Sequence, residues 1–455
     1  MAKPGLPQGM RDFSAETVRK RNFILDTITG VMKLYGYQPL ETPAMENLDT
    51  LLGKYGEEGD KLIFKVLNNG LHDPKNAAKT KAGFEKLMEG KNTSDLTERA
   101  LKYDLTIPFA RYVAMNSGNL TMPFKRYQVQ PVWRADRPQR GRYREFTQCD
   151  ADVVGSRSLI NEVELSLIYH TAFTQLGIPQ YRLKINSRKI LTALAEKCGG
   201  SEKINTLSIA IDKLDKIGLV KVKEELLSRG FTHTQVETAT AFLELSGSNE
   251  EKLEAVQHLF ENNEWAAAGI SEIQYVLQHT PGLPVDVDLT LARGLDYYTG
   301  IIFEAKAPEE VKIGSIGGGG RYDDLTGLFG LPGITGVGIS FGIDRIYDVL
   351  EEMNLFPASI QQSVKALLIN MGAHEADQAF QYAQALRTAG IACELYPESI
   401  KLDKQLRYAD KKHIPFAIII GALEIASKVA LVKDLATGHQ EKVELTRLVE
   451  YFSNK

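Results

Sequence analysis

The sequence predicts a protein of mixed α and β structure with more than one domain. Its 455 residues exceed what a single core commonly holds. A long helical stretch separates two strand-rich regions, and the C-terminal part alternates strands with helices. We therefore divide the chain into a strand-rich part at 1–187, a helical insertion at 188–280, a second strand-rich part at 281–353, a linker at 354–363 and an α/β domain at 364–455.

The composition is that of an ordinary globular protein, with 43% hydrophobic residues, 25% charged residues and a net charge of -4. This net charge excludes no class of partner, because local clusters of charge decide what binds. Cys149, Cys198 and Cys393 lack CxxC spacing, which favours free thiols in a reducing cytoplasm over disulfides or a zinc site. Neither an apolar signal segment nor a run of about 18 apolar residues occurs, so we expect no secretion and no membrane span.

The first strand-rich part begins with a helix. Apolar residues at helical spacing predict it from Ala15 to Tyr35, and Gly36 ends it. The lysine-rich stretch from Lys75 to Lys91 is expected to be a solvated insertion. The following LKYDLTIPFARYVAM is expected to form a strand, a turn and a helix.

A β-hairpin with strands at 124–134 and 142–154 is predicted around the loop ADRPQRG. Alternation along the second strand places these residues on one face: Arg142, Arg144, Phe146, Gln148, Asp150 and Asp152. On the first strand, the corresponding set is Arg126, Gln128, Gln130 and Arg134. Guanidinium groups match phosphate oxygens, whereas the acidic end suits an ammonium group or a ring that donates hydrogen bonds. The platform therefore fits a pair of ligands such as ATP and an amino acid, with a solvent-facing sheet surface as the alternative.

A glycine-rich strand lies in the second strand-rich part, in GVGISFGIDR. Gly336, Gly338 and Gly342 remove side chains along the strand, so that a flat base or a ribose can approach the backbone. The helix after it buries its apolar face and leaves Arg345 to point at a ligand. A packing strand followed by a surface arginine is the alternative. Gly317 to Gly320 likewise form either a flexible turn or a close backbone approach to a ligand.

The C-terminal part reads as alternating strands and helices, with helices at 375–388 and 402–412. This pattern predicts a small α/β domain. Its second helix is moderately basic, which fits nucleic-acid contact and a solvated helix face equally well; the residues are Lys401, Lys404, Arg407, Lys411 and Lys412.

Four motifs in chain order resemble those of class II aminoacyl-tRNA synthetases of the histidine–tRNA ligase family. VWRADRPQRGRYREF is similar to the second class motif and GVGISFGIDRIYDVL to the third, while LARGLDYYTGIIFEA and GGGGRYDDL resemble the two histidine-specific segments. The resemblance covers essentially the whole chain. It implies a mostly antiparallel sheet flanked by helices, with a helical insertion and a C-terminal α/β anticodon-binding domain. The stretch around Pro43 resembles the first class motif, which implies a homodimer.

The resemblance implies a cytoplasmic enzyme that attaches L-histidine to tRNA-His. ATP would be the co-substrate with Mg²⁺, and the reaction would pass through histidyl-adenylate and release pyrophosphate and AMP. Two alternatives stay open. One is a histidine-sensing regulatory paralogue of the same fold, although such relatives typically lack the C-terminal domain and the motif arginines that this chain has. The other is an enzyme that makes adenylate for a different acceptor.

The resemblance also implies roles for single residues. The catalytic residues would be Arg134 and Arg293, and the ATP-binding residues Arg134 on the α-phosphate, Arg345 on the γ-phosphate, Glu145 and Gly342. Asp104, Thr106 and Gln148 would bind the ammonium group of histidine, Asp152 and Tyr298 its imidazole, with Arg293 and Tyr297 in the same site. Tyr297 could equally be a core residue. Gln139 and Arg140 would contact the tRNA acceptor end, and no protein ligand is assigned to a metal.

Family members often carry glutamate at the positions of Asp104 and Asp152. The shorter side chains leave open whether these residues contact histidine directly or through water. Asp324 likewise stands where glycine is frequent in the family.

Overall fold

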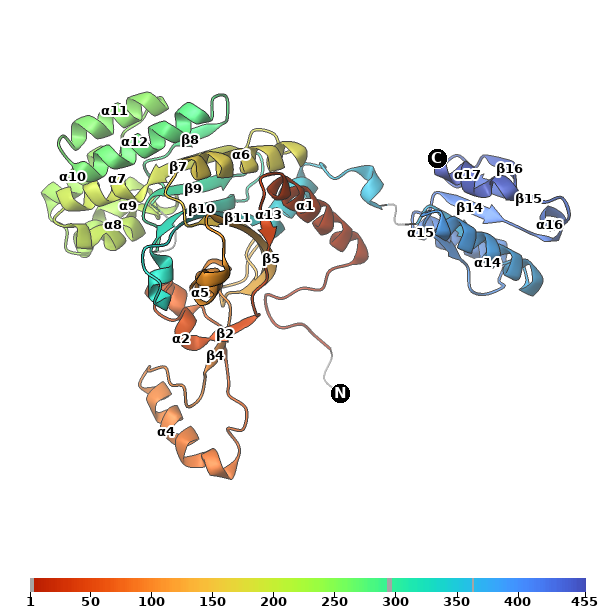
Figure 1. Cartoon of the computed structure of the whole chain (residues 1–455), viewed down its shortest axis with the longest axis horizontal. Helices are drawn as coiled ribbons and strands as arrows, with labels where there is room; N and C mark the ends of the chain where they lie inside the picture. Colours follow the sequence, from red (N-terminus) through yellow and green to blue (C-terminus); the bar gives the residue numbers. More distant parts are fainter. Residues whose placement is uncertain (1–3, 293–296, 362–363) are drawn as a thin grey trace. The chain divides into compact units, whose positions relative to one another are not determined.

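The computed structural model describes residues 4–292, 297–361 and 364–455. The chain divides into two compact units, one made of residues up to Phe13 with Arg21–Leu355, the other of Ser14–Lys20 with Phe356–Lys455. Each unit has its own sheet (Figure 1). None of the helices in the described residues is long and apolar enough to span a bilayer.

An eight-stranded sheet forms the centre of the first unit, with the strand order β1-β5-β6-β11-β10-β9-β7-β8. Its strands are β1 (Gln38–Pro39), β5 (Phe124–Trp133), β6 (Glu145–Val154), β7 (Arg182–Ser187), β8 (Val285–Val287), β9 (Ile301–Lys306), β10 (Ser315–Asp323) and β11 (Thr335–Gly342). All neighbours pair antiparallel except β1 with β5 and β7 with β8 at the two edges. The predicted mostly antiparallel sheet is therefore confirmed.

Helices pack against this sheet on residues that the apolar spacing had marked as core. The predicted N-terminal helix is α1 (Ala15–Leu34), with Ile24, Ile28, Val31 and Met32 fully buried. The other principal helices around the sheet are α5 (Thr106–Asn116), α6 (Ile160–Gln175) and α13 (Ile343–Glu352). Tyr169 of α6 donates its hydroxyl to the carbonyls of Gly318 and Ser340, which ties α6 to β10 and β11.

The hairpin of β5 and β6 pairs without a bulge from Phe124 with Val154 to Trp133 with Glu145. The predicted hairpin is thus correct, but its second strand begins three residues later than expected. Gln139 and Arg142 close a turn through two backbone hydrogen bonds of 3.1 and 2.9 Å, with Gly141 at a φ of 70°. Arg142 and Arg144 consequently lie in the loop and not on the face of the strand.

An arm leaves the first unit between two short strands (Figure 1). The strands β2 (Met45–Asn47), β3 (Lys65–Val66) and β4 (Arg99–Leu101) form a small sheet in the order β2-β4-β3, and α2 (Leu48–Leu51) and α3 (Gly56–Lys61) lie between β2 and β3 in the chain. The arm holds η1 (Pro74–Asn76) and α4 (Ala77–Met88), a helix that the lysine-rich composition did not predict. Only Gly83 of α4 is buried, so this stretch is solvated as expected.

Helices fill the range between β7 and β8. They are α7 (Arg188–Lys197), η3 (Ser201–Lys203), α8 (Ile204–Ile211), α9 (Leu214–Ser228), α10 (His233–Leu243), α11 (Asn249–Leu259) and α12 (Glu264–His279). Local sequence explains where several begin: Thr232 and Ser248 form capping boxes at α10 and α11, and Asn263 caps α12.

The second unit contains a five-stranded sheet in the order β13-β12-β14-β15-β16. The strands are β12 (Ala366–Leu368), β13 (Cys393–Leu395), β14 (Phe416–Ile419), β15 (Val429–Asp434) and β16 (Gln440–Glu444), and the helices are α14 (Ala373–Thr388), α15 (Leu402–Lys411), α16 (Ala422–Ala426) and α17 (Leu448–Ser453). β12 pairs parallel with β13 and β14, whereas β15 and β16 continue antiparallel. The predicted C-terminal α/β domain is confirmed, with two further strands after the βαβα pattern.

Candidate active site

The polar face of the hairpin continues across the sheet as rows of residues. The strand register aligns Arg126, Asp152, Gly338 and Gly320 in one row, Gln128, Asp150, Ser340 and Gly318 in the next, and Gln130, Gln148 and Gly342 in a third. Side chains directly opposite on neighbouring strands lie on the same face of a sheet. The rows are polar on β5 and β6 and mostly glycine on β10 and β11, so the polar groups border a space that the glycines leave open.

A small cavity lies on this face and collects most of the predicted binding residues. Its lining consists of Asp104, Thr106, Arg134, Gln148, Asp150, Asp152, Tyr297, Tyr298, Gly318, Tyr322, Gly338, Ile339 and Ser340. These residues come from six separate parts of the chain. Only the folded sheet brings them together.

Asp152 is held in place by two buried partners that the motifs did not identify. The carboxylate forms an ion pair of 2.8 Å with Arg126 and accepts a hydrogen bond of 2.6 Å from the Tyr322 hydroxyl. The Arg126 side chain is fully buried, with its guanidinium 4.4 Å from the centre of the Phe109 ring. Burial raises the pKa of Asp152, and Arg126 and Tyr322 offset part of that rise. Arg126 could have been found from the hairpin register, which puts it opposite Asp152.

Asp104 is likewise buried and already engaged. Its Oδ1 accepts hydrogen bonds from the Tyr55 hydroxyl at 2.9 Å and the Ile107 backbone NH at 3.1 Å, while its Oδ2 accepts one from the Tyr297 hydroxyl at 3.1 Å. Burial raises the pKa of Asp104 despite these donors and the nearby charge of Arg134. Tyr297 packs against the apolar core and also donates its hydroxyl to Asp104, and its predicted contact with histidine stays a prediction.

The two arginines assigned to ATP differ in their surroundings. Arg134 donates through Nε to the Tyr103 carbonyl at 3.0 Å, with its guanidinium 4.3 Å from the centre of the Tyr103 ring. Arg345 donates to the carbonyls of Gly141 at 3.0 Å and Ser315 at 2.7 Å. The side chain of Arg345 thus ties the hairpin loop to β10, and its predicted contact with a ligand stays a prediction.

Of the remaining predicted residues, Thr106, Gln148 and Tyr298 line the cavity, whereas Glu145, Gly342, Gln139 and Arg140 are not among its lining residues. Gln148 donates to the Ser340 hydroxyl at 3.0 Å. Glu145 is exposed and accepts a hydrogen bond of 2.8 Å from Trp133 Nε1, and Gly342 ends β11 directly before α13. Gln139 lies in the loop turn beside Arg140, which forms an exposed ion pair with Glu352. Arg293 lies outside the described residues.

Three acceptor oxygens in this cavity lack a hydrogen-bond partner among the described residues: Gln148 Oε1, Asp150 Oδ1 and Asp152 Oδ2, the last of which is ion-paired with Arg126. Buried acceptors are nearly always satisfied, so their clustering favours a ligand that carries several donors. Asp150 has no role in the motif resemblance. Its shared strand face with Gln148 and Asp152 was the signal that could have marked it.

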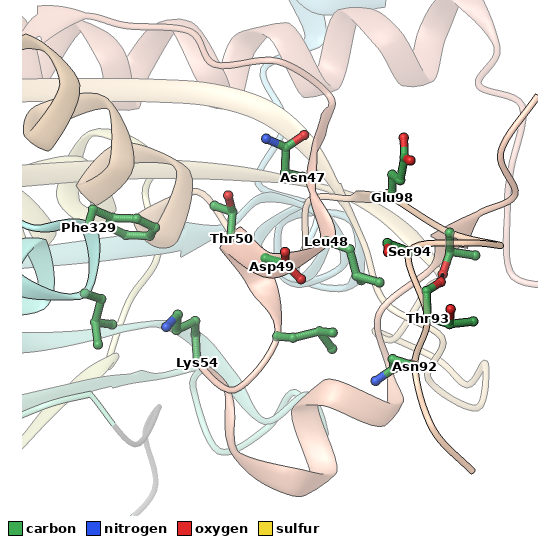
Figure 2. Close-up of a pocket in the computed structure, with 13 residues that line it drawn as sticks. Asn47, Leu48, Asp49, Thr50, Lys54, Asn92, Thr93, Ser94, Glu98 and Phe329 are labelled. Carbon is green, nitrogen blue, oxygen red and sulfur yellow. Dashed lines mark hydrogen bonds between the residues drawn. The ribbon is translucent and has the colours of Figure 1, made fainter. Parts of the chain in front are cut away.

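A larger hollow of about 570 Å³ lies elsewhere on the first unit (Figure 2). Asn47, Thr50, Lys54, Asn92, Thr93, Glu98 and Phe329 are among its lining residues. It shares no residue with the cavity on the sheet, and its lining includes Lys54 but no arginine. Size alone therefore does not identify the site, whereas the convergence of buried polar groups does.

Comparison with known proteins gives consistent matches over both units. A family model described as histidyl-tRNA synthetase matches residues 80–346, and one described as an anticodon binding domain matches residues 365–455. The chain is 50% identical over 452 residues to the histidine–tRNA ligase of Bacteroides fragilis and 49% identical over 451 residues to that of Christiangramia forsetii, with 98% of each chain covered in both cases. The crystal structure of histidyl-tRNA synthetase from Nostoc sp. PCC 7120 is similar with a TM-score of 0.81 and 31% identity, over 100% of both chains.

Proposed function

Since this chain belongs to the histidyl-tRNA synthetase family, we propose that the cavity on the β5-β6-β11-β10 sheet binds histidine and that the neighbouring arginines bind ATP. The enzyme joins histidine to tRNA at the expense of ATP, through histidyl-adenylate. Relatives that are about 50% identical to this chain over nearly its full length are named histidine–tRNA ligases. These names do not favour the histidine-sensing alternative.

The cluster of buried acceptors without a hydrogen-bond donor is the observation that carries the assignment of the cavity. Histidine brings an ammonium group with three donors and a ring that can donate and accept. In this proposal Asp104, Thr106 and Gln148 bind the ammonium group, and Asp152 with Tyr298 binds the ring. Arg126 and Tyr322 position Asp152, and Tyr55 and Tyr297 position Asp104.

In this proposal, the α-phosphate of ATP lies near Arg134 and its γ-phosphate near Arg345. Glu145 and Gly342 lie beside the nucleotide. A histidine carboxylate oxygen attacks the α-phosphorus, and the bond from that phosphorus to the pyrophosphate oxygen breaks. Arg134 and Arg293 stabilise the negative charge that builds on the α-phosphate. The site needs no covalent enzyme intermediate, because it holds the two reacting groups in line. Arg345 exchanges its carbonyl partners for phosphate oxygens when ATP binds.

Magnesium enters with the nucleotide in this proposal. No group of three or more His, Cys, Asp or Glu side chains in the described residues is arranged to hold a metal ion. Phosphate oxygens are ligands that Mg²⁺ prefers. The ion would neutralise charge on the triphosphate.

The second step transfers histidine to tRNA. The 3′-terminal adenosine hydroxyl attacks the carbonyl carbon of the adenylate, and AMP leaves. We place the acceptor end of tRNA-His near Gln139 and Arg140, which lie in an exposed loop turn next to the site. The C-terminal α/β domain at 364–455 would bind the anticodon, and the exposed basic side chains Lys401, Lys404 and Arg407 supply positive charge for it.

We also propose a homodimer, because the stretch around Pro43 resembles the motif that pairs class II subunits. A cytoplasmic location fits the three cysteines, which are all buried free thiols. The division at 1–187, 188–280, 281–353 and 364–455 stays our proposal for the domains, with 354–363 as the linker.

Charging of a tRNA-His transcript with labelled histidine tests this function. We expect histidyl-tRNA to form only when ATP is present and a tRNA for another amino acid to stay uncharged. Failure to charge tRNA-His under conditions where AMP forms would show that the adenylate serves a different acceptor.

A further inference from the structure

Asp150 is a buried carboxyl group in the histidine cavity that the mechanism above does not use. It lies in the middle of β6, opposite Gln128 on β5 and Ser340 on β11, and is 3% exposed. Asp150 lines the cavity, and its buried Oδ1 has no hydrogen-bond partner among the described residues. A buried polar atom left unsatisfied is destabilising, so this oxygen favours a ligand that supplies the missing hydrogen bond.

The three carboxyl groups of the cavity differ in what already satisfies them. Asp152 has the Arg126 guanidinium and the Tyr322 hydroxyl, and Asp104 has two tyrosine hydroxyls and a backbone NH. Asp150 has a hydrogen bond with the Ser340 hydroxyl and the more distant charge of Arg126. The substrate ammonium group neutralises one carboxylate. One further carboxyl group in the cavity then needs a proton.

Asp150 lies on β6 between Gln148, the proposed ammonium contact, and Asp152, the proposed ring contact, so its position brings it within reach of the ring. Asp150 and Asp152 are two residues apart on one face of β6, which places them roughly 7 Å apart. A flat ring that hydrogen-bonds at about 2.8 Å to a group on either side needs about this separation. Tyr298, the other predicted ring contact, lines the same cavity.

The acidity of Asp150 matches that of an imidazole. Burial raises the pKa of Asp150 to about 7, with Asp152 and Asp104 adding to the rise and Arg126 and Ser340 opposing it. An unperturbed imidazole has a pKa of about 6.5. Near neutral pH a single proton can therefore lie on either partner at little cost.

We propose that Asp150 is a specificity-determining residue that binds the substrate imidazole through one proton shared between its carboxyl group and a ring nitrogen. When the acid holds the proton, it donates to the neutral ring; when the ring holds it, the carboxylate accepts from an imidazolium. Side chains without a titratable ring leave Asp150 unpaired, and a site built on such polar contacts rejects them strongly. This inference rests on the proposed histidine site and adds to it a residue that the motifs do not assign.

Shared-proton binding predicts a specific pH dependence. Above about pH 7 both Asp150 and free histidine have lost the shared proton, so binding must take one up and the histidine KM rises about tenfold per pH unit. The other titratable groups around Asp150 are Asp104, Asp152, Cys149, Arg126, Arg134, Tyr169, Tyr297, Tyr298 and Tyr322. Burial raises the pKa values of the four tyrosines and of the Cys149 thiol further above neutral, and arginine stays charged, so these groups do not titrate in this range.

The test measures histidine-dependent ATP–pyrophosphate exchange from about pH 6 to about pH 9 with wild-type enzyme and Asp150→Asn. The variant keeps the size of the side chain and removes its proton. We expect the histidine KM to rise about tenfold or more at pH 7, the steep alkaline rise to disappear, and the ATP KM to stay unchanged. Asp348→Asn is the matched control, because Asp348 on α13 also has a raised pKa and an unpaired buried oxygen but lies outside the cavity.

A variant with the wild-type histidine KM and the same alkaline rise would overturn the inference. An equal rise in the KM of ATP would do so as well, since it would make Asp150 a support of the sheet. Calorimetry on wild-type enzyme at about pH 8 in buffers of different ionisation enthalpy needs no variant, and we expect uptake of about one proton per histidine. Absence of uptake contradicts the shared proton. Wild-type enzyme without histidine-dependent exchange would instead contradict the proposed function itself.

Discussion

At the scale of single residues, the site depends on buried partners that set the charge and the orientation of its carboxylates. Asp152 faces the cavity, but Arg126 and Tyr322 determine its charge and orientation. Replacing Asp152 by alanine would leave a fully buried arginine unpaired, which typically costs about 3–5 kcal/mol of stability. Such a variant would report on folding more than on recognition of histidine.

Tyr322→Phe separates recognition from folding. The ring that packs against Gly336 remains, and only the hydroxyl that donates to Asp152 is lost. A hydrogen bond to a charged group contributes about 1.5–3 kcal/mol, so we expect the histidine KM to rise about tenfold or more with an unchanged ATP KM. Steady-state exchange kinetics check this, with Tyr181→Phe as a control outside the cavity. Equal KM values for histidine in wild type and Tyr322→Phe would show that Asp152 does not read the substrate.

The sequence could supply several of these residues and not others. Alternation along the hairpin placed Gln148, Asp150 and Asp152 on one face, because the period of a strand is local information. The tyrosines on Asp104 could not be predicted in that way, since Tyr55 and Tyr297 are 49 and 193 residues away from it. The contacts of these tyrosines with Asp104 depend on tertiary packing, which the pattern of residues adjacent in the sequence does not reveal.

At the scale of elements, the glycines of β10 serve two different purposes. They lie in a regular strand, so the flexible-turn alternative for Gly317 to Gly320 is wrong. A Cβ on Gly317 would collide with Tyr169, and one on Gly319 would collide with the backbone of Gly338 and Ile339. A Cβ on Gly318 would meet only the Phe303 carbonyl, at 3.4 Å, on the face that borders the cavity. Close packing of the sheet thus requires glycine at position 319, whereas glycine at position 318 leaves space for a ligand.

Two alanine variants test this division. Gly318→Ala should keep the thermal midpoint of the wild type and lower the rate of pyrophosphate exchange at least about tenfold, because the methyl group occupies ligand space. Gly319→Ala should lower the free energy of unfolding by about 1–3 kcal/mol, because the added methyl group overpacks the sheet. Thermal melting and exchange assays on both proteins check the two effects. Full activity in Gly318→Ala would argue against a ligand on this face of β10.

Some helices and strands were predicted correctly and others were not, for physical reasons. The N-terminal helix and the hairpin follow from strong periodicity and turn residues. Helix α4 was missed because its exposed lysines and small residues give no apolar stripe, and only Gly83 is buried. The start of the second hairpin strand was predicted too early, because the residues around the turn between Gln139 and Arg142 alternate in the sequence as residues of a strand do.

At the scale of the whole molecule, we propose that the two units divide the reaction. All residues that line the proposed histidine cavity belong to the first unit, and so do Arg345, Glu145 and Gly342. The second unit matches an anticodon binding domain. Adenylate formation should therefore need only the first unit, whereas charging of tRNA draws on contacts in both.

Truncation after Leu355 tests this division. We expect the truncated enzyme to retain histidine-dependent pyrophosphate exchange within a few-fold, while charging at limiting tRNA falls at least about tenfold and depends less on salt. Circular dichroism and light scattering must first show that the protein is folded with the same oligomeric state as the full chain. Undiminished charging by such a protein would rule out the anticodon-binding role.

Pyrophosphate exchange by the wild-type protein with each of the standard amino acids in turn tests the central claim most directly, because it isolates the step that the cavity is built to perform. The account predicts rapid, ATP-dependent exchange with L-histidine and none above background with the others, including glutamine and phenylalanine. Exchange with a different amino acid, or no exchange with histidine, would contradict it.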